Sequence, residues 1–517
     1  MMKKIFPYLF AIVLLLILIF LFTAKISNNR THAIELKKQL TGPGFDSWRS
    51  ETGDWKIFAA VSPDPENEKK LITEPGTGVF FNGNEGRTVP LISKDAFGDI
   101  RAHVEFMLPK DSNSGIYFMG RYEVQIYDSW NKQSEYPGIE CGGIYQRWDE
   151  NRTPKGYEGH SPRINAARPP GAWQWFDVVF RAPRFDKAGN KISNAEFEKV
   201  YFNGYLVQKN IKLSGPTRGS LYKDEKPTGP LLIQGDHGPV AFRNIWVSSA
   251  DINPFFAMDT GTRDEKHRSA REQVTMLGEL GYDGIDHTGC EGLPELLEEL
   301  DNNGKRLFAV YLDVWIDDIS NKYNAGLPEA IQLLKNRDVI LWVPLRSKKL
   351  RPSSRAGDSL AVKIIREIAD MAAVSGLKVA LYPHNNFWME RVEDAVRVAE
   401  KTDRDNVGVT FNLCHWLKSG DEPNLISRIR TAMPYLYIVT INGADHRGGW
   451  KELIRPLDSG TYDVYNFLRT LKTGGYDGPV GLQGYGIGGD VYDNLKRSMA
   501  AWQKMNLQYM TKKQNEH

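Results

Sequence analysis

The chain has 517 residues, of which 41% are hydrophobic and 25% are charged, and its formal net charge is +2 at pH 7. This length exceeds what one hydrophobic core usually serves, so we expect at least two globular domains. The near balance of charge gives no general electrostatic reason to expect a nucleic acid partner. The three cysteines, Cys141, Cys290 and Cys414, form neither a disulfide framework nor a zinc spacing, and we interpret them as small buried residues.

Residues 1–30 are predicted to be a targeting segment. Lys3 and Lys4 precede an uncharged apolar run from Ile5 to Phe22. A run of this length can span a bilayer, whereas the apolar part of a cleavable signal is typically ~7–15 residues. We therefore expect a membrane anchor over residues 5–22, with the remainder exported to the periplasm or the cell surface. A cleaved signal peptide is the alternative.

Residues 44–250 show short β-strand patterns separated by turn residues. Asn203-Gly204 between two apolar runs is a strong hairpin signal. Many antiparallel strands over roughly 200 residues indicate a sandwich or a jelly roll. The predicted strands are Thr77–Phe81, Asp99–Leu108, Ser114–Phe118, Glu123–Tyr127, Gly142–Tyr145, Trp173–Arg181, Glu198–Phe202, Gly229–Gln234 and Ala241–Val247.

One of these strands has an unusual polar face. Tyr122, Val124 and Ile126 alternate with Glu123 and Gln125, and this period of two predicts a half-buried strand. A carboxylate and a carboxamide two residues apart, flanked by aromatic residues, are typical of a sugar-binding surface. A plain solvent-exposed face of a sandwich explains the pattern equally well.

The order of several pieces supports a family resemblance. FGDIRAHVEFMLPKDSNSGIYF, YEVQIYD, GGIY, GAWQWFDVVFRA, VYFNGYLV and IQGDHGPVAFRNIWV follow one another in the first half. Together they resemble the 3-keto-disaccharide hydrolase family, which implies a concanavalin-like sandwich that acts on a glycoside oxidised at carbon 3. A ketone at that carbon acidifies the proton on carbon 2, so cleavage can proceed by elimination with one base, one acid and donors to the enolate oxygen.

Few residues in this half suit those roles. Glu123 is the candidate base, or a ligand of sugar hydroxyls, and His237 is the candidate acid. Gln125, Tyr145 and Gln234 are expected to hold hydroxyl groups, Asn113 to shape the rim, and Asp128 to orient His237 or bind a cation. A plain turn at Asp236-His237-Gly238-Pro239 is the alternative for His237, and a structural ion pair is preferred for Arg243.

Residues 253–505 change to apolar strands that alternate with amphipathic helices, and residues 506–517 are expected to form a tail. Eight strands with interleaved helices over about 240 residues predict a (β/α)₈ TIM barrel. The predicted strands are Phe255–Thr260, Gly284–Thr288, Leu307–Asp313, Val339–Arg346, Val379–His384, Gly408–Cys414, Tyr437–Asn442 and Pro479–Tyr485. The predicted helices are Asp264–Leu280, Leu293–Asn302, Asp358–Ser375, Glu390–Thr402, Val464–Lys472 and, after the barrel, Asp490–Gln508.

Functional residues of such barrels lie at the carboxyl ends of the strands. Here these ends are rich in hydrogen-bonding groups, which suits a polyhydroxylated ligand. They carry Asp259, Asp286, His287, Asp313, Arg346, His384, Asn385, Asn412, His415, Asn442, Asp445, Gln483 and Tyr485.

The pieces FFAMDTG, LGYDGID, ALYPH, VGVTFNLCH and GPVGLQ resemble the xylose isomerase-like sugar phosphate isomerase/epimerase superfamily. That resemblance implies a divalent metal held by Glu, Asp, His and Glu on strands five to eight. At three of these positions the chain carries Tyr382, Asn412 and Gln483, and the strand-seven histidine falls near Ile441 or Asn442. Neutral groups are weak ligands of hard cations, so we expect no standard metal site. His384 and His415 with Asp445 could still bind zinc or manganese.

Without a metal, His384 or His415 could act as a base, with Asn412, Asn442 and Gln483 as donors to the substrate. The combined prediction is an enzyme that cleaves 3-keto-glycosides in the sandwich and isomerises or hydrates the released sugar in the barrel. A non-catalytic cell-surface carbohydrate-binding protein is the alternative. A retaining glucanase with Glu123 and Asp128 is weaker, because residues of opposite parity point to opposite faces of a strand.

Overall fold

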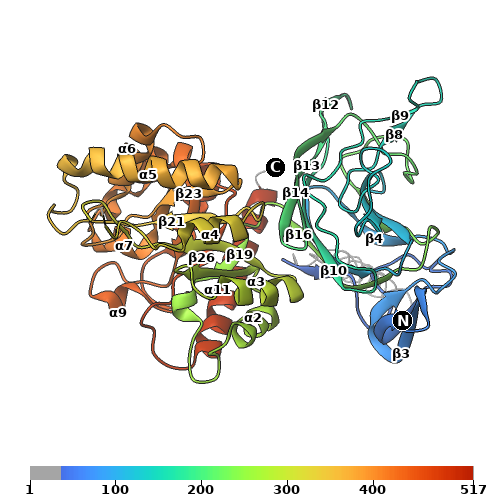
Figure 1. The fold of residues 1–517 in the computed structure, drawn as a ribbon, viewed down its shortest axis with the longest axis horizontal. Coiled ribbons are helices and arrows are strands. Elements are labelled where there is room, and N and C mark those ends of the chain that lie inside the picture. Colours follow the sequence, from blue (N-terminus) through green and yellow to red (C-terminus); the bar gives the residue numbers. More distant parts are fainter. Residues whose placement is uncertain (1–35, 319, 516–517) are drawn as a thin grey trace, which may run out of the picture.

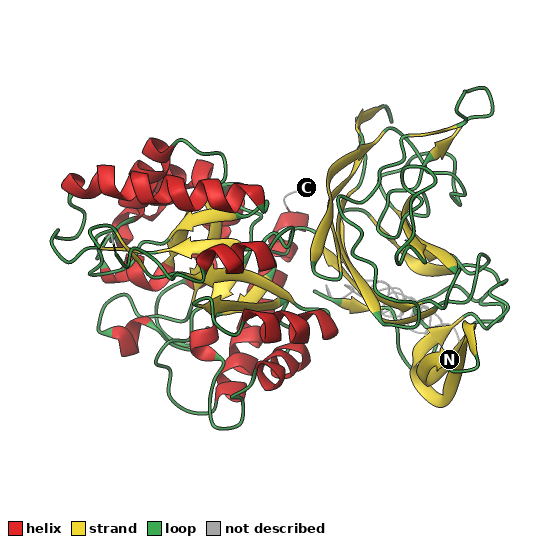
Figure 2. Ribbon diagram, in the orientation of Figure 1, coloured by secondary structure: helices red, strands yellow, loops and turns green. Residues whose placement is uncertain are grey.

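The computed structural model describes residues 36–318 and 320–515, which form two domains side by side (Figure 1). The predicted anchor at residues 5–22 lies outside these residues. Within them, no helix combines the length and the apolar character needed to cross a membrane. Figure 2 shows one domain built almost entirely of strands and loops and the other built of strands surrounded by helices.

The first domain contains two antiparallel sheets. The larger has the order β14-β13-β10-β5-β16-β3-β2, with β1 paired to β16, and the smaller has the order β4-β15-β6-β7. The larger sheet comprises β1 (Lys38–Gln39), β2 (Lys56–Asp64), β3 (Asn67–Phe81), β5 (Ile100–Met107), β10 (Gln174–Arg181), β13 (Ala195–Phe202), β14 (Tyr205–Leu213) and β16 (Ala241–Ser249). The smaller comprises β4 (Leu91–Phe97), β6 (Asn113–Phe118), β7 (Tyr122–Tyr127) and β15 (Gly229–Ile233).

Aromatic side chains fill the space between the two sheets. Phe118 of β6 packs against Phe180 of β10 and Phe197 of β13, with ring centroids 5.3 Å apart in both pairs. Tyr122, Val124 and Ile126 point into this core as their alternation predicted. The predicted strand Gly142–Tyr145 is an extended segment that joins β7 through one bridge, Val124 to Ile144.

Residues 138–170 form a long cover with little regular structure, in agreement with their Gly and Pro content. They contain the short pair β8 (Arg147–Trp148) and β9 (Gly156–Tyr157). Another short pair, β11 (Arg184–Phe185) and β12 (Lys191–Ser193), follows β10. Glu123 and Gln125 of β7 are buried. The strand is therefore buried on both faces, whereas its pattern predicted burial on one face.

The second domain is a closed eight-stranded parallel barrel, which confirms the predicted architecture. The order is β17-β18-β19-β21-β23-β24-β25-β26. Its strands are β17 (Phe255–Ala257), β18 (Gly284–Thr288), β19 (Arg306–Tyr311), β21 (Ile340–Val343), β23 (Lys378–Leu381), β24 (Val407–Asn412), β25 (Leu436–Ile441) and β26 (Val480–Leu482), and β20 (Val314–Trp315) pairs with β22 (Leu345–Arg346) outside it.

Helices cover the barrel: among the described residues, six of the ten α-helices were predicted from 3.6-residue patterns and four short ones were not. The ten are α2 (Ala270–Glu279), α3 (Leu293–Asn302), α4 (Leu327–Leu333), α5 (Asp358–Val374), α6 (Val392–Thr402), α7 (Leu413–Lys418), α8 (Leu425–Ala432), α9 (Trp450–Leu453), α10 (Val464–Thr473) and α11 (Val491–Asn515). The first begins with a capping box in which Ser269 and Glu272 bond each other's backbone N–H groups. The last continues to Asn515, through the segment predicted as a tail, and Lys513 reaches Asp251 at 2.6 Å.

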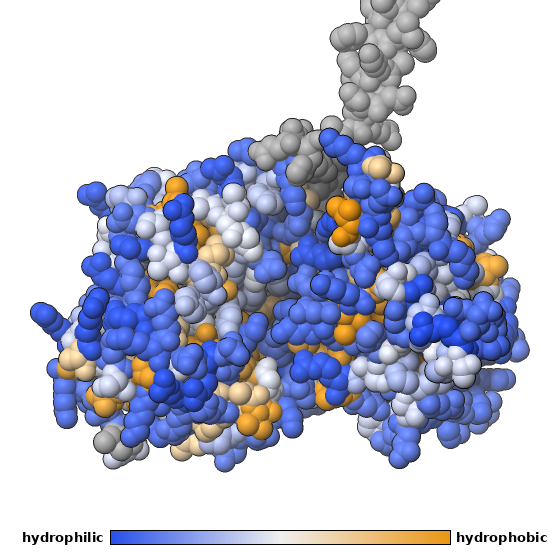
Figure 3. All heavy atoms as spheres, turned by 90° about the horizontal axis from the view of Figure 1, so that it is seen from above, coloured by the Kyte–Doolittle hydropathy of each residue, from blue (hydrophilic) through white to orange (hydrophobic). Residues whose placement is uncertain are grey.

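The outer face of the larger sheet contacts the barrel at the amino-terminal ends of its strands. Tyr201 of β13 donates a hydrogen bond to Asp338, just before β21, at 2.7 Å. Arg337 bonds both Tyr205 and Asp301 at 2.8 Å. The carboxyl ends of the barrel strands therefore face away from the sandwich. Figure 3 shows a mostly hydrophilic face of the molecule, on which apolar residues form only small, scattered groups.

Candidate functional sites

The first candidate site lies on the face of the smaller sheet that points away from the core. Cross-strand pairing puts Gly115 opposite Gln125 and Tyr117 opposite Glu123, and Asn113 opposite Tyr127. The backbone N–H of Gln234, just after β15, donates to Gly115 O at 2.9 Å. Four of the predicted residues, Asn113, Glu123, Gln125 and Gln234, are therefore brought to one sheet by backbone register alone.

Glu123 is the buried acid of this face. Its side chain is 2% exposed, and Oε2 has no hydrogen-bond partner among the described residues. Burial, together with the charge of Asp236, raises the pKa of Glu123 to about 8, although Tyr117 acts in the opposite direction. The carboxyl group therefore keeps its proton at neutral pH.

A glycine makes the space for this carboxyl group. A Cβ atom on Gly115 would lie 2.1 Å from Glu123 Oε1, far inside van der Waals contact. Any larger residue at this cross-strand neighbour would displace the acid. The sequence Asn113-Ser114-Gly115 was identified by the family resemblance, but this steric reason for its glycine was not.

One tyrosine side chain, Tyr117, interacts with Glu123, and Tyr145 contacts it through the backbone; only Tyr145 was predicted. The Tyr145 N–H donates to Glu123 O at 3.2 Å, and the Tyr145 hydroxyl lies 3.1 Å from that of Tyr136. Tyr117, which sequence reasoning missed, interacts with Glu123 directly, and burial and Glu123 raise its pKa well above the ordinary value. Tyr117 could have been predicted, because Asn113, Gly115 and Tyr117 alternate along β6 and therefore share one face of the strand.

The Asp236-His237 turn lies at the edge of this face. His237 Nδ1 is 2.6 Å from Asp236 Oδ1, and both side chains are about half exposed. Asn82 holds the turn in place by donating to Gly235 O and Gly238 O and accepting from Val240 N–H. These hydrogen bonds fix the turn, in which the His237 imidazole pairs with the Asp236 carboxylate.

The position of Asp128 corrects the expectation that it orients His237 or binds a cation. Its Oδ2 accepts from the Asp111 N–H and from the Lys132 ammonium group, both at 2.9 Å. The side chain is 4% exposed. Asp128 therefore ties the end of β7 to the 108–112 turn, and the carboxylate beside His237 is Asp236.

Arg243 pairs with Glu105 at 2.6 Å, the structural role expected for it.

The second candidate site is a cavity of about 380 Å³ at the carboxyl ends of the barrel strands. It is mostly apolar, with a few convergent polar groups. The lining residues are Met258, Thr260, Asp286, Thr288, Tyr311, Tyr382, His384, His415, Trp450, Ile454, Gln483 and Tyr485. Of the residues predicted from the sequence, five line this cavity: Asp286, His384, His415, Gln483 and Tyr485.

Asn412 and Asn442 depart from the predicted substrate-binding role. Asn412 donates to the Tyr382 hydroxyl, and its Oδ1 accepts from His415 N–H at 3.1 Å as the N-cap of α7. Asn442 is fully buried and donates to Gly443 O and Leu453 O. Both amides therefore support the wall of the cavity from behind.

The two histidines are held in different tautomers by one neighbour. His384 Nδ1 lies 2.9 Å from the Asn385 carbonyl oxygen, which can only accept, so Nδ1 carries a proton. His415 Nδ1 accepts from Asn385 N–H at 3.3 Å, so the proton of the neutral ring is on Nε2. Burial lowers the pKa of His384 to about 4, and burial and His384 lower that of His415 well below its ordinary value.

Asp286 lines the cavity and lies next to a second acid, Asp259, that is not among the lining residues. Asp259 accepts two hydrogen bonds from Thr288, at 2.7 and 2.9 Å. Asp286 Oδ1 accepts from Asp259 N–H at 2.6 Å, while its Oδ2 has no partner in the part of the chain that the structure describes. Burial, and next the charge of Asp259, raise the pKa of Asp286 well above the ordinary value, which favours the protonated form of this carboxyl group.

The residues at this site do not fit the divalent metal that the barrel family implies. Within residues 36–318 and 320–515, no group of three His, Cys, Asp or Glu side chains is arranged to hold an ion. Asp445, considered as a ligand beside the two histidines, instead pairs with Arg455 at 2.6 Å and bonds Thr461. Neutral Tyr382, Asn412 and Gln483 replace the family's acids and supply no compensating charge.

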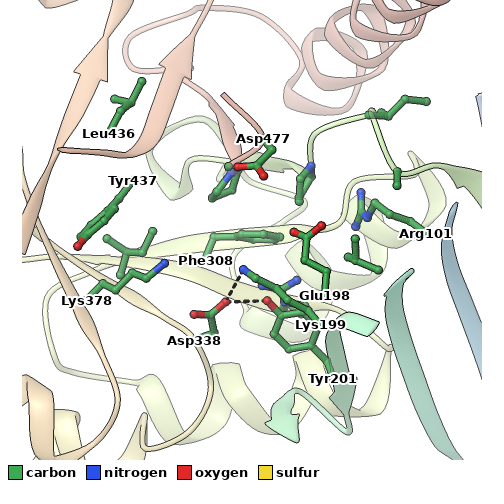
Figure 4. Close-up of a pocket in the computed structure, with 18 of the residues that line it drawn as sticks. Arg101, Glu198, Lys199, Tyr201, Phe308, Asp338, Lys378, Leu436, Tyr437 and Asp477 are labelled. Carbon is green, nitrogen blue, oxygen red and sulfur yellow. Dashed lines mark hydrogen bonds and ion pairs between the residues drawn. The ribbon is translucent and has the colours of Figure 1, made fainter. Parts of the chain in front are cut away.

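A third cavity, of about 260 Å³, lies between the two domains (Figure 4). Lys199 and Tyr201 from β13 converge on Asp338 Oδ2 from the barrel, at 3.0 and 2.7 Å. Burial alone would raise the pKa of Asp338, but Lys199 and Lys378 hold it below its ordinary value. The paired charges here join the domains, and the cavity lies away from both candidate sites.

Comparisons with known proteins agree with this division. Residues 38–248 match the model of the 3-keto-alpha-glucoside-1,2-lyase-like domain, and residues 277–504 match that of the xylose isomerase-like TIM barrel. A ketose 3-epimerase from Arthrobacter globiformis is 25% identical over 162 residues, which are 31% of this chain and 52% of the relative. The chain thus spans about half the length of that relative.

Two solved structures cover one domain each. A candidate glycosyl hydrolase from Parabacteroides distasonis is 24% identical, covers 42% of this chain and 84% of its own, and has a TM-score of 0.30. A 3-keto-D-glucoside 4-epimerase from E. coli is 19% identical, covers 49% of this chain and 99% of its own, and has a TM-score of 0.40.

Proposed function

Since the chain is a fusion of a 3-keto-alpha-glucoside-1,2-lyase-like domain and a xylose isomerase-like TIM barrel, we propose that it cleaves 3-keto-glycosides in the sandwich and converts the released sugar in the barrel. The observation that carries the first step is the buried, protonated Glu123 beside the Asp236–His237 pair. One group that can give a proton and one that can take a proton are what elimination from a 3-keto-glycoside requires.

The proposed roles reverse those suggested by the sequence. A proton on His237 Nδ1 is donated to Asp236, which leaves Nε2 free to accept a proton, so His237 is the base. Glu123 has a raised pKa and gives its proton to the leaving group, so it is the acid.

The reaction is balanced as follows. His237 Nε2 removes the proton from carbon 2, and the electron pair forms an enediolate with the carbon 3 ketone. That pair then forms the carbon 1–carbon 2 double bond as the bond from carbon 1 to the glycosidic oxygen breaks. Glu123 protonates the departing oxygen, so the products are an alcohol and an unsaturated ketone, to which water can add. Asn113, Gln125, Tyr145 and Gln234 are proposed to bind the sugar hydroxyls and the enolate oxygen.

The test is release of the alcohol from a 3-keto-glucoside and from its unoxidised parent. The purified protein should release it from the first compound alone. Glu123→Gln should lower the rate by about 10²–10⁴-fold, because the amide cannot donate the proton. The rate of the unchanged protein should fall as the pH rises through the Glu123 pKa of about 8.

Glu68→Gln is the matched control, since Glu68 is an exposed residue that pairs with Lys110. It should leave the rate unchanged. Binding of the 3-keto-glucoside without any release would contradict the proposal and favour a carbohydrate-binding protein. Equal release from both compounds would favour an ordinary glycosidase.

We also propose that the protein is exported, on the basis of the apolar run at residues 5–22. Small sugars as substrate and product are compatible with a protein outside the cytoplasm. Fractionation of cells that make the protein should recover it with the envelope, and recovery with the cytoplasm would contradict the proposal.

A further inference from the structure

Two histidines with different tautomers line the barrel cavity. The cavity presents an unprotonated His384 Nε2, to which no described residue donates a hydrogen bond, beside a His415 whose Nε2 carries a proton. The two ring centroids are 3.9 Å apart, and Phe387 stacks on His384 at 3.7 Å. One acceptor and one donor therefore lie side by side, and both are fixed.

The backbone of a single residue fixes this pair. Asn385 accepts from His384 through its carbonyl group and donates to His415 through its N–H group. The peptide groups cannot exchange these roles, because a carbonyl has no proton to give. The Asn385 side chain is itself held by Glu390 at 3.1 Å, so the turn that carries the two peptide groups is anchored.

Proton removal from carbon also requires a group that polarises the neighbouring carbonyl group, and Asp286 is placed to do this. Its Oδ1 is occupied by the Asp259 N–H, and its unpartnered Oδ2 is the atom left to donate a proton in the cavity. The side chain is 1% exposed, so water does not compete for it. In metal-dependent sites a bound cation polarises this carbonyl group. The described residues at this cavity form no site for such a cation.

We propose that this barrel moves a proton on the carbon next to the carbonyl group of a ketose without a metal ion, with His384 as the base and with Asp286 and His415 as donors to the carbonyl oxygen. His384 Nε2 takes the proton from the carbon, the electron pair forms the enediol double bond, and the carbonyl oxygen receives the Asp286 proton. For an epimer, a proton from solvent adds to the same carbon from the other side, the oxygen returns its proton to Asp286 as the carbonyl group forms again, and His384 loses its proton to solvent. For an isomer, His384 returns its proton to the former carbonyl carbon, and the hydroxyl group on the neighbouring carbon loses its proton to become the new carbonyl group while Asp286 regains a proton.

This inference deepens the proposed role of the barrel, and its test is independent of glycoside cleavage. The His237→Gln protein, which lacks the proposed base of the sandwich, is dialysed against EDTA and incubated in D₂O with 3-keto-D-glucose or with D-fructose. Loss of the proton signals next to the carbonyl is followed by NMR, and the barrel variants below are made in this background. The spontaneous rate without protein is subtracted. Failure of the sandwich to release an alcohol would not affect this measurement, and failure of exchange would not affect alcohol release.

We expect exchange with at least one of the two sugars in the presence of EDTA, and no increase on addition of Mn²⁺. His384→Gln should lower the rate at least about 100-fold. Asp286→Asn should lower it about 10-fold or more, because the amide keeps the bond to the Asp259 N–H but cannot release a proton. Circular dichroism spectra and melting temperatures of both variants show whether they remain folded.

The matched control is Asp445→Asn, which removes the third ligand of the alternative metal site and should leave exchange unchanged. Exchange that appears only with Mn²⁺, or that Asp445→Asn abolishes, would overturn the proposal in favour of a metal site. Absence of exchange with both sugars would overturn it, as would exchange that folded His384→Gln and Asp286→Asn proteins retain.

Discussion

At the scale of single residues, the sandwich site depends on the space that Gly115 leaves for Glu123. Alternation in β7 was enough to place Glu123 and Gln125 on one face and the apolar residues on the other, and the structure confirms that division. It was not enough to reveal that the polar face is covered. The residues that contact β7, at 142–145 and at Thr217, are distant from it in sequence, and so is Asp236, whose charge adds to burial in raising the Glu123 pKa.

Gly115→Ala tests this steric account. The new methyl group would lie 2.1 Å from Oε1 of Glu123, so the carboxyl must move by an ångström or more. Such a displacement should reduce alcohol release about 10²-fold while the protein remains folded. Gly42→Ala is the control, because no atom lies within 4 Å of its added methyl group. Equal rates for the two variants would show that the position of Glu123 is not critical.

At the scale of elements, the barrel was easier to predict than the sandwich. Each barrel strand is a short apolar run, and all eight were found, although no helix was predicted between β19 and β21 or between β24 and β25. In the sandwich, β2, β4 and β14 are absent from the predicted strands, although the hairpin signal at Asn203-Gly204 pointed to β14. In β2 only Val61 is buried, and the strand contains Pro63. The amides of Asn412 and Asn442 look like ligand groups in the sequence, but their partners are backbone and side-chain atoms that only the fold brings near.

The outer face of β5 carries a titratable group that the barrel buries. His103 is 2% exposed, and its Nδ1 is 2.7 Å from Asp177 and its Nε2 3.5 Å from Glu105. It stacks on Trp246, and Gly304 of the barrel closes over it. Burial favours the neutral ring, but the two carboxylates outweigh it and raise the pKa of His103. Nearby Lys305 and Arg243 also interact with Glu105.

A pH-dependent stability follows from this group. Because its folded-state pKa lies above the ordinary 6.5, the charged ring contributes fully below pH 6.5, and the contribution is lost as the pH rises through the folded-state value. His103→Gln should therefore cost about 3–5 kcal/mol at pH 6 and less at pH 9, measured by denaturant unfolding. His446→Gln, at a half-exposed pair with Glu422, is the control and should cost little at either pH. A His103→Gln cost independent of pH would contradict the account.

At the scale of the whole molecule, the two candidate sites face away from each other. The larger sheet of the sandwich packs against the amino-terminal ends of the barrel strands, whereas the barrel cavity lies at their carboxyl ends (Figure 1). Glu123 is on the smaller sheet, on the far side of the sandwich core from the barrel. A sugar released by one site must therefore leave the protein before it enters the other.

This arrangement predicts that the intermediate mixes with the solution. When a labelled 3-keto-glucoside is cleaved in the presence of excess unlabelled 3-keto-D-glucose, the label in the product of the barrel should be diluted in proportion to the unlabelled sugar. Retention of the full label would require a direct passage between the sites. The interdomain cavity, with its paired Lys199 and Asp338, would then be the first region to examine.

The central claim is that the sandwich breaks the glycosidic bond by removing the proton on carbon 2 of a 3-keto sugar. The most direct test compares alcohol release from a 3-keto-glucoside that carries hydrogen at carbon 2 with release from the same compound that carries deuterium there. The account predicts a primary isotope effect, with the deuterated compound clearly slower, and loss of cleavage of both compounds in Glu123→Gln. Equal rates for the two compounds, together with release from the unoxidised glucoside, would contradict it.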